Sequence, residues 1–144
     1  MNFKQLFAFK GRLNRKPFII HIAIGYVLIL LNIFLLAFFA LSLSYDPSNP
    51  KIFLNLLPTP VLAIFAIITC VAVLFIFANI TRRLQDINKG FRWAIIMLAL
   101  SGMPIIYFPC LLYLCIKRGT IGPNEYGEDP LQKDEDTQIE EEIK

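Results

Sequence analysis

Charged residues are absent from three long stretches of this 144-residue sequence. Residues 17–45, 52–81 and 93–116 contain no Asp, Glu, Lys or Arg. Only 17% of the chain is charged and 56% is hydrophobic, whereas a soluble domain has about a quarter of its residues charged. This composition excludes a soluble domain and predicts an integral membrane protein. The length suits one domain, because no hydrophilic segment is long enough to fold alone.

Residues that build metal and catalytic centres are also scarce. Cys70, Cys110 and Cys115 lie in uncharged stretches without CxxC spacing, which argues against a disulfide framework or a zinc site. His21 is the single histidine, and no metal ligand or catalytic partner lies near it in the sequence. Glycine-rich phosphate loops, HExxH and GxSxG are missing. We therefore predict a protein that is not an enzyme and holds no cofactor or metal.

The three uncharged stretches predict about three transmembrane helices, over residues 18–44, 60–80 and 93–116. A helix of about 20 residues crosses a hydrocarbon core of about 30 Å. The first stretch is too long for the apolar part of a signal peptide, so we interpret it as a retained anchor. The expected fold is an all-α membrane protein with a single helical domain over 1–131 and an acidic, disordered tail over 132–144.

The third stretch carries helix-breaking residues, namely Gly102, Pro104 and Pro109. Its 24 residues would extend about 36 Å as a helix, enough for a kinked crossing but too short for two full spans. We favour a crossing kinked by proline. The alternative is a re-entrant segment that leaves the membrane on the side where it entered.

The distribution of basic residues predicts the orientation. The head (1–17) and the connector TRRLQDINKGFR (81–92) carry nine Lys and Arg, while the first loop (45–60) carries one. With three crossings, the positive-inside rule favours a cytoplasmic N terminus and an exported tail. The re-entrant alternative would instead keep the tail on the side of the head.

The net charge of +3 combines two opposite regions. Residues 1–118 hold 12 basic and 2 acidic residues, and residues 119–144 hold 2 basic and 9 acidic ones. The basic excess follows the predicted membrane boundaries, so we assign it to topology and headgroup contact and expect no binding to nucleic acid.

The densest charge group beside the bilayer is Arg82, Arg83 and Asp86. If the second helix continues that far, Asp86 shares a face with both arginines and pairs with one, leaving the other for phosphate or carboxylate. Arg12 and Arg15 share that side of the membrane. A topology signal that touches headgroups and an anion or lipid site are both compatible with this pattern.

Three segments resemble the DUF805 family of small bacterial inner-membrane proteins of unknown function. They are FKGRLNRKPF (9–18), RRLQDINKGFRW (82–93) and GTIGPNEYGEDP (119–130), in the order and spacing of that family. The matching residues include Gly11, Arg12, Arg15, Arg82, Arg83, Asp86, Asn124, Tyr126 and Asp129, which we take as a candidate anion, lipid or structural motif. Also matched are Phe9, Leu84, Trp93, Gly119, Gly122, Gly127 and Pro130.

The resemblance implies a multi-pass protein of the bacterial inner membrane and brings no reaction with it. Gln85 stands where the family usually has histidine, which weakens any acid–base or metal chemistry at the connector. Asn88 replaces a usual glycine, and Ile19 and Arg92 replace common tryptophans.

Two functional hypotheses follow. The leading one is a non-enzymatic protein that binds anionic phospholipid headgroups, another membrane protein or a second copy of itself through its arginines. The alternative is a subunit of an oligomeric small-solute transporter or channel, suggested by the broken third stretch and by Asn32, Asn79 and Ser101. No Asp, Glu, Lys or Arg is predicted at the membrane midplane, which argues against ion coupling. The structural alternative for Asn32 and Asn79 is that their side chains form hydrogen bonds between helices.

Overall fold

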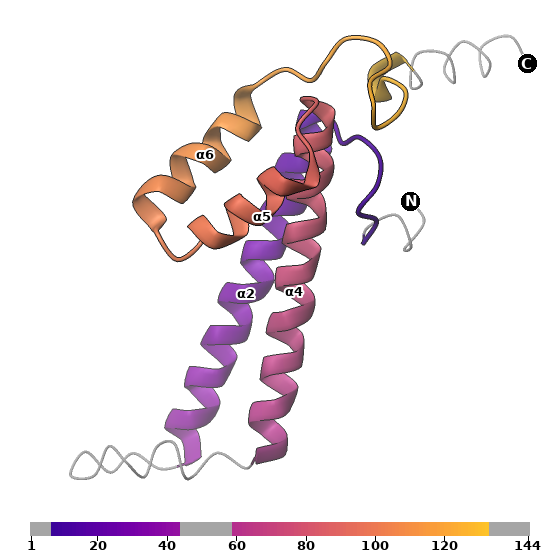
Figure 1. Ribbon diagram of the computed structural model, residues 1–144. Helices are drawn as coiled ribbons and strands as arrows, with labels where there is room; N and C mark the ends of the chain where they lie inside the picture. Colours follow the sequence, from indigo (N-terminus) through magenta and orange to yellow (C-terminus); the bar gives the residue numbers. More distant parts are fainter. Residues whose placement is uncertain (1–6, 44–58, 133–144) are drawn as a thin grey trace, which may run out of the picture. The chain divides into compact units, whose positions relative to one another are not determined.

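The computed structural model of the chain describes residues 7–43 and 59–132. Within these residues there are four helices with defined bounds, residues 130–132 are also helical, and there is no strand, so the all-α prediction is confirmed there. The helices are α2 (Arg15–Leu43), α4 (Thr59–Asp86), α5 (Phe91–Leu100) and α6 (Pro104–Ile116) (Figure 1). The predicted acidic tail lies, except for Gln132, outside the described residues.

The chain divides into two compact units. Unit 1 is Met1–Ile22 together with Phe75–Lys144, and unit 2 is Ala23–Leu74. The beginning of α2 and the end of α4 therefore belong to unit 1, along with α5 and α6. In unit 2, the remainder of α2 runs beside the remainder of α4 (Figure 1).

Helices α2 and α4 supply the two long apolar segments that the sequence predicts. Arg15–Phe39 and Thr59–Asp86, of 25 and 28 residues, are each long and apolar enough to cross a membrane. Pro60 lies in the first turn of α4, where the missing N–H of a proline costs no helical hydrogen bond. Helix α4 does not stop at the predicted boundary near Ile80 but continues to Asp86. This extension gives the connector arginines a helical framework.

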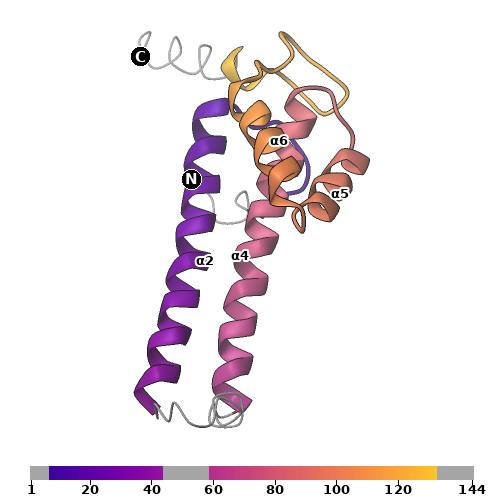
Figure 2. The same ribbon diagram turned by 90° about the vertical axis from the view of Figure 1, so that its left-hand side faces the viewer.

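The third apolar stretch is not the single kinked helix that we predicted. It forms two short helices, α5 and α6, joined by a turn (Figure 2). The turn is closed by hydrogen bonds from Ser101 N to Leu98 O at 3.1 Å and from Met103 N to Leu100 O at 2.8 Å. Proline disfavours helical backbone in the residue before it, and Met103, before Pro104, has φ −122° and ψ 80°. The helix must therefore end and restart here, with Pro104 in the first turn of α6.

The end of α4 explains one departure from the family pattern. Lys89 N donates to Leu84 O at 2.8 Å and Asn88 N donates to Gln85 O at 3.1 Å, which together form a Schellman cap. The cap requires a left-handed residue, and Asn88 has φ 59°. Asparagine is the residue that best tolerates this conformation after glycine, so Asn88 can replace the usual glycine.

The interior of unit 1 mixes apolar and polar side chains. Phe18, Ala78 and Ala94 are fully buried, and so are Asn79 and Thr81. Buried polar groups need hydrogen-bond partners. The arrangement of those partners is what defines the candidate site.

Candidate functional site

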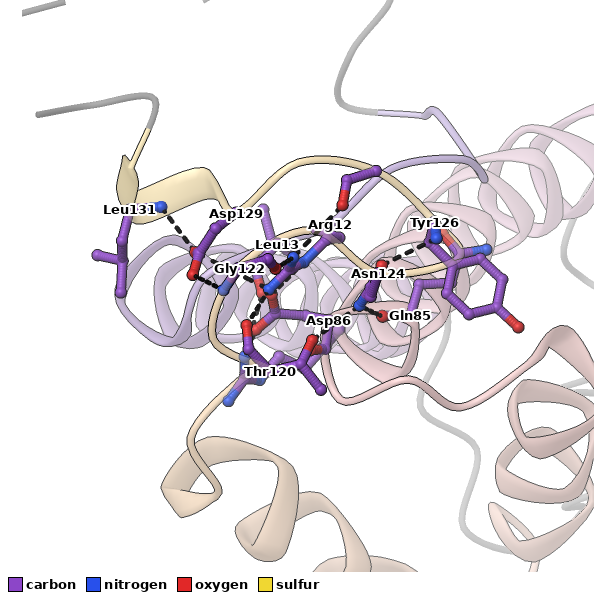
Figure 3. A network of polar contacts seen from close by, with 12 residues as sticks. Arg12, Leu13, Gln85, Asp86, Thr120, Gly122, Asn124, Tyr126, Asp129 and Leu131 are labelled. Carbon is purple, nitrogen blue, oxygen red and sulfur yellow. Dashed lines mark hydrogen bonds and ion pairs between the residues drawn. The ribbon is translucent and has the colours of Figure 1, made fainter. Parts of the chain in front are cut away.

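The guanidinium of Arg12 joins three distant segments of unit 1. Arg12 is buried, and its Nε donates to Asp86 Oδ1 at 3.0 Å. Its Nη2 donates to the carbonyl of Thr120, and its Nη1 donates to the carbonyls of Gly122 at 2.5 Å and Gly127 at 3.4 Å. Figure 3 shows Arg12 at the centre of these contacts. Arg12 thereby fixes the segment after α6 against the end of α4.

Arg83 makes a second set of contacts from inside α4. Its Nε donates to Leu114 O at 2.9 Å, and its Nη2 donates to the carbonyl of Lys117. Its Nη1 donates to Leu13 O at 3.2 Å and to Asp86 Oδ2. Carbonyls at the C-terminal end of a helix have no partners within the helix and carry negative partial charge. Fully buried Arg83 therefore caps the C-terminal end of α6.

Asp86 forms ion pairs with both arginines at once. Its Oδ1 accepts from Arg12 and its Oδ2 from Arg83, and the carboxylate is 1% exposed. The predicted pairing of Asp86 with a connector arginine is thus found for Arg83, at spacing i, i+3. The main chain of Asp86 is also used, because its carbonyl accepts from Thr120 N at 2.8 Å and from Thr120 Oγ1 at 3.0 Å.

A compact turn holds the third motif against the connector. Asn124 donates from Nδ2 to Gln85 O at 3.0 Å and to Thr120 Oγ1 at 2.8 Å, and its Oδ1 accepts from Tyr126 N at 2.8 Å. Asn124 and Gly127 also exchange main-chain hydrogen bonds of 3.0 and 3.1 Å. Asn124 therefore acts as a structural residue that shapes the turn and binds it to α4.

Asp129 closes the network on its outer side. Its Oδ2 accepts from Gly122 N at 3.0 Å, its Oδ1 accepts from Leu131 N at 3.1 Å, and Arg12 Nη2 lies 3.8 Å from Oδ1. Burial raises the pKa of the Asp129 carboxyl. The two backbone N–H groups, Arg12 and Arg118 lower it further than burial raises it, so this pKa lies below its ordinary value. Asp129 is therefore ionised at neutral pH.

A cavity of about 440 Å³ opens beside this network. Arg15 and Arg118 lie on its wall, and both are exposed. Arg15 Nη1 donates to Ile116 O at 3.3 Å. The rest of the lining is Asn14, Arg83, Asp86, Gly119, Thr120, Ile121, Gly122, Pro123, Asp129, Leu131 and Gln132.

The structure thus brings together most of the residues that the sequence singled out. Arg12, Arg83, Asp86, Asn124 and Asp129 share one network, and Arg15 lies on the adjoining cavity wall. Gly11 has φ 105°, a conformation that favours glycine, in the turn that precedes Arg12. Arg82 is half-buried and is not among the cavity-lining residues. The Tyr126 side chain lies against Gly90, where an added Cβ would stand 3.1 Å from the tyrosine Oη.

Three residues in contact with the network were not among the candidate site residues. Gln85 Nε2 donates to Phe9 O at 3.0 Å, and Thr120 supplies main-chain and side-chain contacts to Asp86. At Gly119, an added Cβ would stand 2.7 Å from Cγ of Asp86, so a larger residue does not fit. The sequence marked Gly119 only through its place in the third motif. The folded geometry gives the reason why glycine is needed there.

The lone histidine also has a partner. His21 Nδ1 lies 2.8 Å from Asn79 Oδ1, and Asn79 Nδ2 donates to Phe75 O at 2.7 Å. Because an amide oxygen only accepts, Nδ1 of His21 carries the proton in this contact. His21 is therefore a buried structural residue between the start of α2 and the end of α4.

These features define a class: a helical protein with two segments long enough to span a bilayer and a buried arginine–aspartate network at the end of one of them. The chain belongs to the DUF805 family, described as protein of unknown function, whose model matches residues 6–128. The match covers the first two motifs and most of the third. No curated protein and no solved structure matches the chain.

Proposed function

We propose that this protein is a non-enzymatic membrane protein that binds the anionic headgroup of a phospholipid in the cavity beside its arginine network. The observation that carries the proposal is that two of the arginines are buried in ion pairs while two others are exposed. Arg12 and Arg83 are buried and paired with Asp86, whereas Arg15 and Arg118 are exposed on the wall of a cavity of about 440 Å³.

The chemistry of the wall suits a phosphate group. Arginine presents several N–H donors in a planar fork that matches phosphate oxygens. Asn14 and the main chain around Thr120 add neutral polar groups to the lining. The cavity also has the size of an ordinary small-molecule site, about 300–1,000 Å³. A phosphate diester headgroup would therefore meet both charge and hydrogen-bond donors.

The position of the two arginines supports a lipid as the source of that phosphate. Arg15 is the first residue of α2, and Arg118 follows the C-terminal end of α6. Both therefore lie at the polar ends of apolar helices, the depth at which basic residues meet anionic headgroups.

The state of Asp86 supports a binding role rather than catalysis. A general base must be able to accept a proton from its substrate. Both carboxylate oxygens of Asp86 already accept from guanidinium groups. The transporter alternative gains no support from its polar residues. Asn32, Asn79 and Ser101 each donate to a carbonyl within their own unit.

The test compares two variants that lose equal charge. The variant Arg15→Gln/Arg118→Gln removes the cavity cations, and the control Lys10→Gln/Lys16→Gln removes two exposed cations that do not line the cavity. Native mass spectrometry of the full chain measures retention of phosphatidylglycerol against phosphatidylcholine. We expect the cavity variant to bind phosphatidylglycerol about tenfold more weakly, the equivalent of about 1.4 kcal/mol, and the control to stay near wild type.

If both variants lose the same affinity for phosphatidylglycerol, lipid binding depends only on the net charge of the protein. That result would contradict a lipid site in the cavity. Inorganic phosphate separates a lipid from a soluble ligand. If phosphate alone displaces phosphatidylglycerol completely at low concentration, the ligand is a free anion rather than a lipid headgroup.

A further inference from the structure

Helices α5 and α6 are too short to cross a membrane separately. They contain 10 and 13 residues, which extend about 15 and about 20 Å, against a hydrocarbon core of about 30 Å. They run as a hairpin with the turn around Gly102 at its tip (Figures 1 and 2). Such a hairpin reaches roughly half the depth of a bilayer.

Both ends of the hairpin are held at one place in unit 1. The chain enters α5 directly after the cap of α4, and it leaves α6 where Arg83 binds the carbonyls of Leu114 and Lys117. Thr120 N then donates to Asp86 O at 2.8 Å. The residues before and after the hairpin are therefore in direct contact, which a single crossing of the membrane would not allow.

Each helix of the hairpin buries only one narrow stripe of side chains. The buried residues stand at helical spacing, Ala94 and Met97 on α5 and Tyr107, Leu111 and Leu114 on α6. Large apolar side chains cover the other sides of both helices, among them Ile95, Ile96, Ile105, Phe108, Leu112 and Ile116, with Ile105 90% exposed. A helix that is apolar all round belongs in a protein core or in lipid. Contact with a flat protein surface would require apolar side chains along only one further stripe of each helix. Lipid acyl chains, in contrast, can cover all of its remaining sides.

Polar features are confined to the base of the hairpin. Lys89 Nζ lies 5.1 Å from the centre of the Trp93 ring, and Arg92, Lys117 and Arg118 are exposed nearby in the sequence. Tryptophan and basic residues mark the membrane interface. At the tip, the N–H groups of Ser101 and Met103 and the hydroxyl of Ser101 all donate to carbonyls, which reduces the number of polar groups that the turn exposes.

From these observations we propose that the α5–α6 hairpin is a re-entrant element whose exposed face is covered by the acyl chains of a single leaflet. The hairpin does not cross the membrane, and residues 119–131 lie on the same side as residues 9–16 and 82–90. This inference does not depend on which anion the neighbouring cavity binds.

Sidedness is measured with an impermeant thiol reagent. The background is the full chain with Cys70, Cys110 and Cys115 replaced by alanine, into which Lys89→Cys, Gly102→Cys or Glu128→Cys is introduced. In sealed right-side-out and inside-out vesicles, we expect Lys89→Cys and Glu128→Cys to be labelled from the same side. Gly102→Cys should be labelled from neither side until detergent is added. Labelling of Lys89→Cys and Glu128→Cys from opposite sides would overturn the proposal.

The covering of the hairpin is tested with a single tryptophan. In a Trp93→Phe background, Ile105→Trp should be strongly quenched by phospholipids brominated on their acyl chains, and Glu128→Trp should not be. If Ile105→Trp is protected from these lipids and becomes quenched only when the protein is diluted to one copy per nanodisc, a second copy covers the hairpin and the proposal is wrong.

Discussion

The two units of this protein use polar groups in opposite ways. In unit 1, Arg12, Arg83 and Asp86 are buried together and joined to the main chain of the residues after α6. In the described part of unit 2, the buried polar side chain is Asn32, which donates to Phe65 O at 3.1 Å and to Thr69 Oγ1 at 2.7 Å. Most other side chains of unit 2 are apolar and exposed.

The difference separates two ways in which helices can be held together. Apolar surfaces gain little by leaving lipid for each other, so helix pairs in a membrane rely on close packing and a few hydrogen bonds. The helices of unit 2 fit that description. Unit 1 adds ion pairs whose groups come from three distant segments, so its geometry forms only when all three are present. The following predictions test this contrast.

The largest effect is expected at Asp86. Asp86→Asn leaves two buried guanidinium groups without their carboxylate, and breaking a buried ion pair costs about 3–5 kcal/mol. Trp93, the single tryptophan, lies in unit 1 and reports its unfolding by fluorescence in detergent. Glu128→Gln removes the same charge from an exposed position and should leave the unfolding transition unchanged. Similar unfolding curves for the two variants would contradict a structural role for the network.

The next effect is steric. Gly119→Ala places a Cβ 2.7 Å from Cγ of Asp86, so the segment must move away from the network, at a cost of about 1–3 kcal/mol. Gly102→Ala is the matched control, because an added Cβ there meets nothing within 4 Å. We expect a lower unfolding temperature for Gly119→Ala alone. Equal unfolding temperatures in the two variants would show that Gly119 is not in close contact with Asp86.

A smaller effect, which depends on pH, is expected at Asp129. The charged form accepts hydrogen bonds from Gly122 N and Leu131 N, and Asp129→Asn should cost about 1–2 kcal/mol at neutral pH. Because folding lowers the pKa of this carboxyl, its contribution is complete above the unfolded pKa of about 3.9 and is lost as the pH falls through the folded pKa. The difference in unfolding temperature between wild type and variant should therefore shrink below about pH 4. A difference that persists unchanged in acid would exclude the carboxylate charge as its origin.

The smallest effect is expected in unit 2. Asn32→Leu removes hydrogen bonds between two helices, which are worth about 0.6 kcal/mol in membrane proteins. Asn79→Leu, the matched change in unit 1, should cost more because it leaves buried His21 without its partner. Combined with Asp86→Asn, the effect of Asn32→Leu should be additive, since the residues share no partner. Coupling between Asn32→Leu and Asp86→Asn would show that the two units do not behave separately.

Local features of the sequence predicted the fold well. Long uncharged stretches predicted α2 and α4, and the spacing of the connector predicted that Asp86 pairs with one of its two arginines, which is Arg83 in the structure. Breakers in the third stretch predicted a bend, yet length alone could not distinguish a kinked helix from a hairpin. The decisive element was the succession of Gly102 and Pro104, which ends one helix and starts another.

The partners of the network could not be predicted, because they are distant along the chain. Arg12 and Asp86 are separated by 74 residues, and Arg12 and Gly122 by 110. Nothing in local spacing distinguishes an arginine that meets headgroups from one that is buried. An arginine of either kind stands beside the end of an apolar segment in the sequence. Arg12 and Arg15, which looked alike in sequence, therefore have different environments in the structure.

The contacts of Arg12 have a consequence for biosynthesis. A chain enters the membrane from its N terminus, so Arg12 is made long before Thr120 and Gly122, to which it donates. During that interval the carbonyl acceptors of its guanidinium have not yet been made. Once the final segment has been made, the same charge is withdrawn into the protein. The network around Arg12 can therefore form only after the last motif has been synthesised.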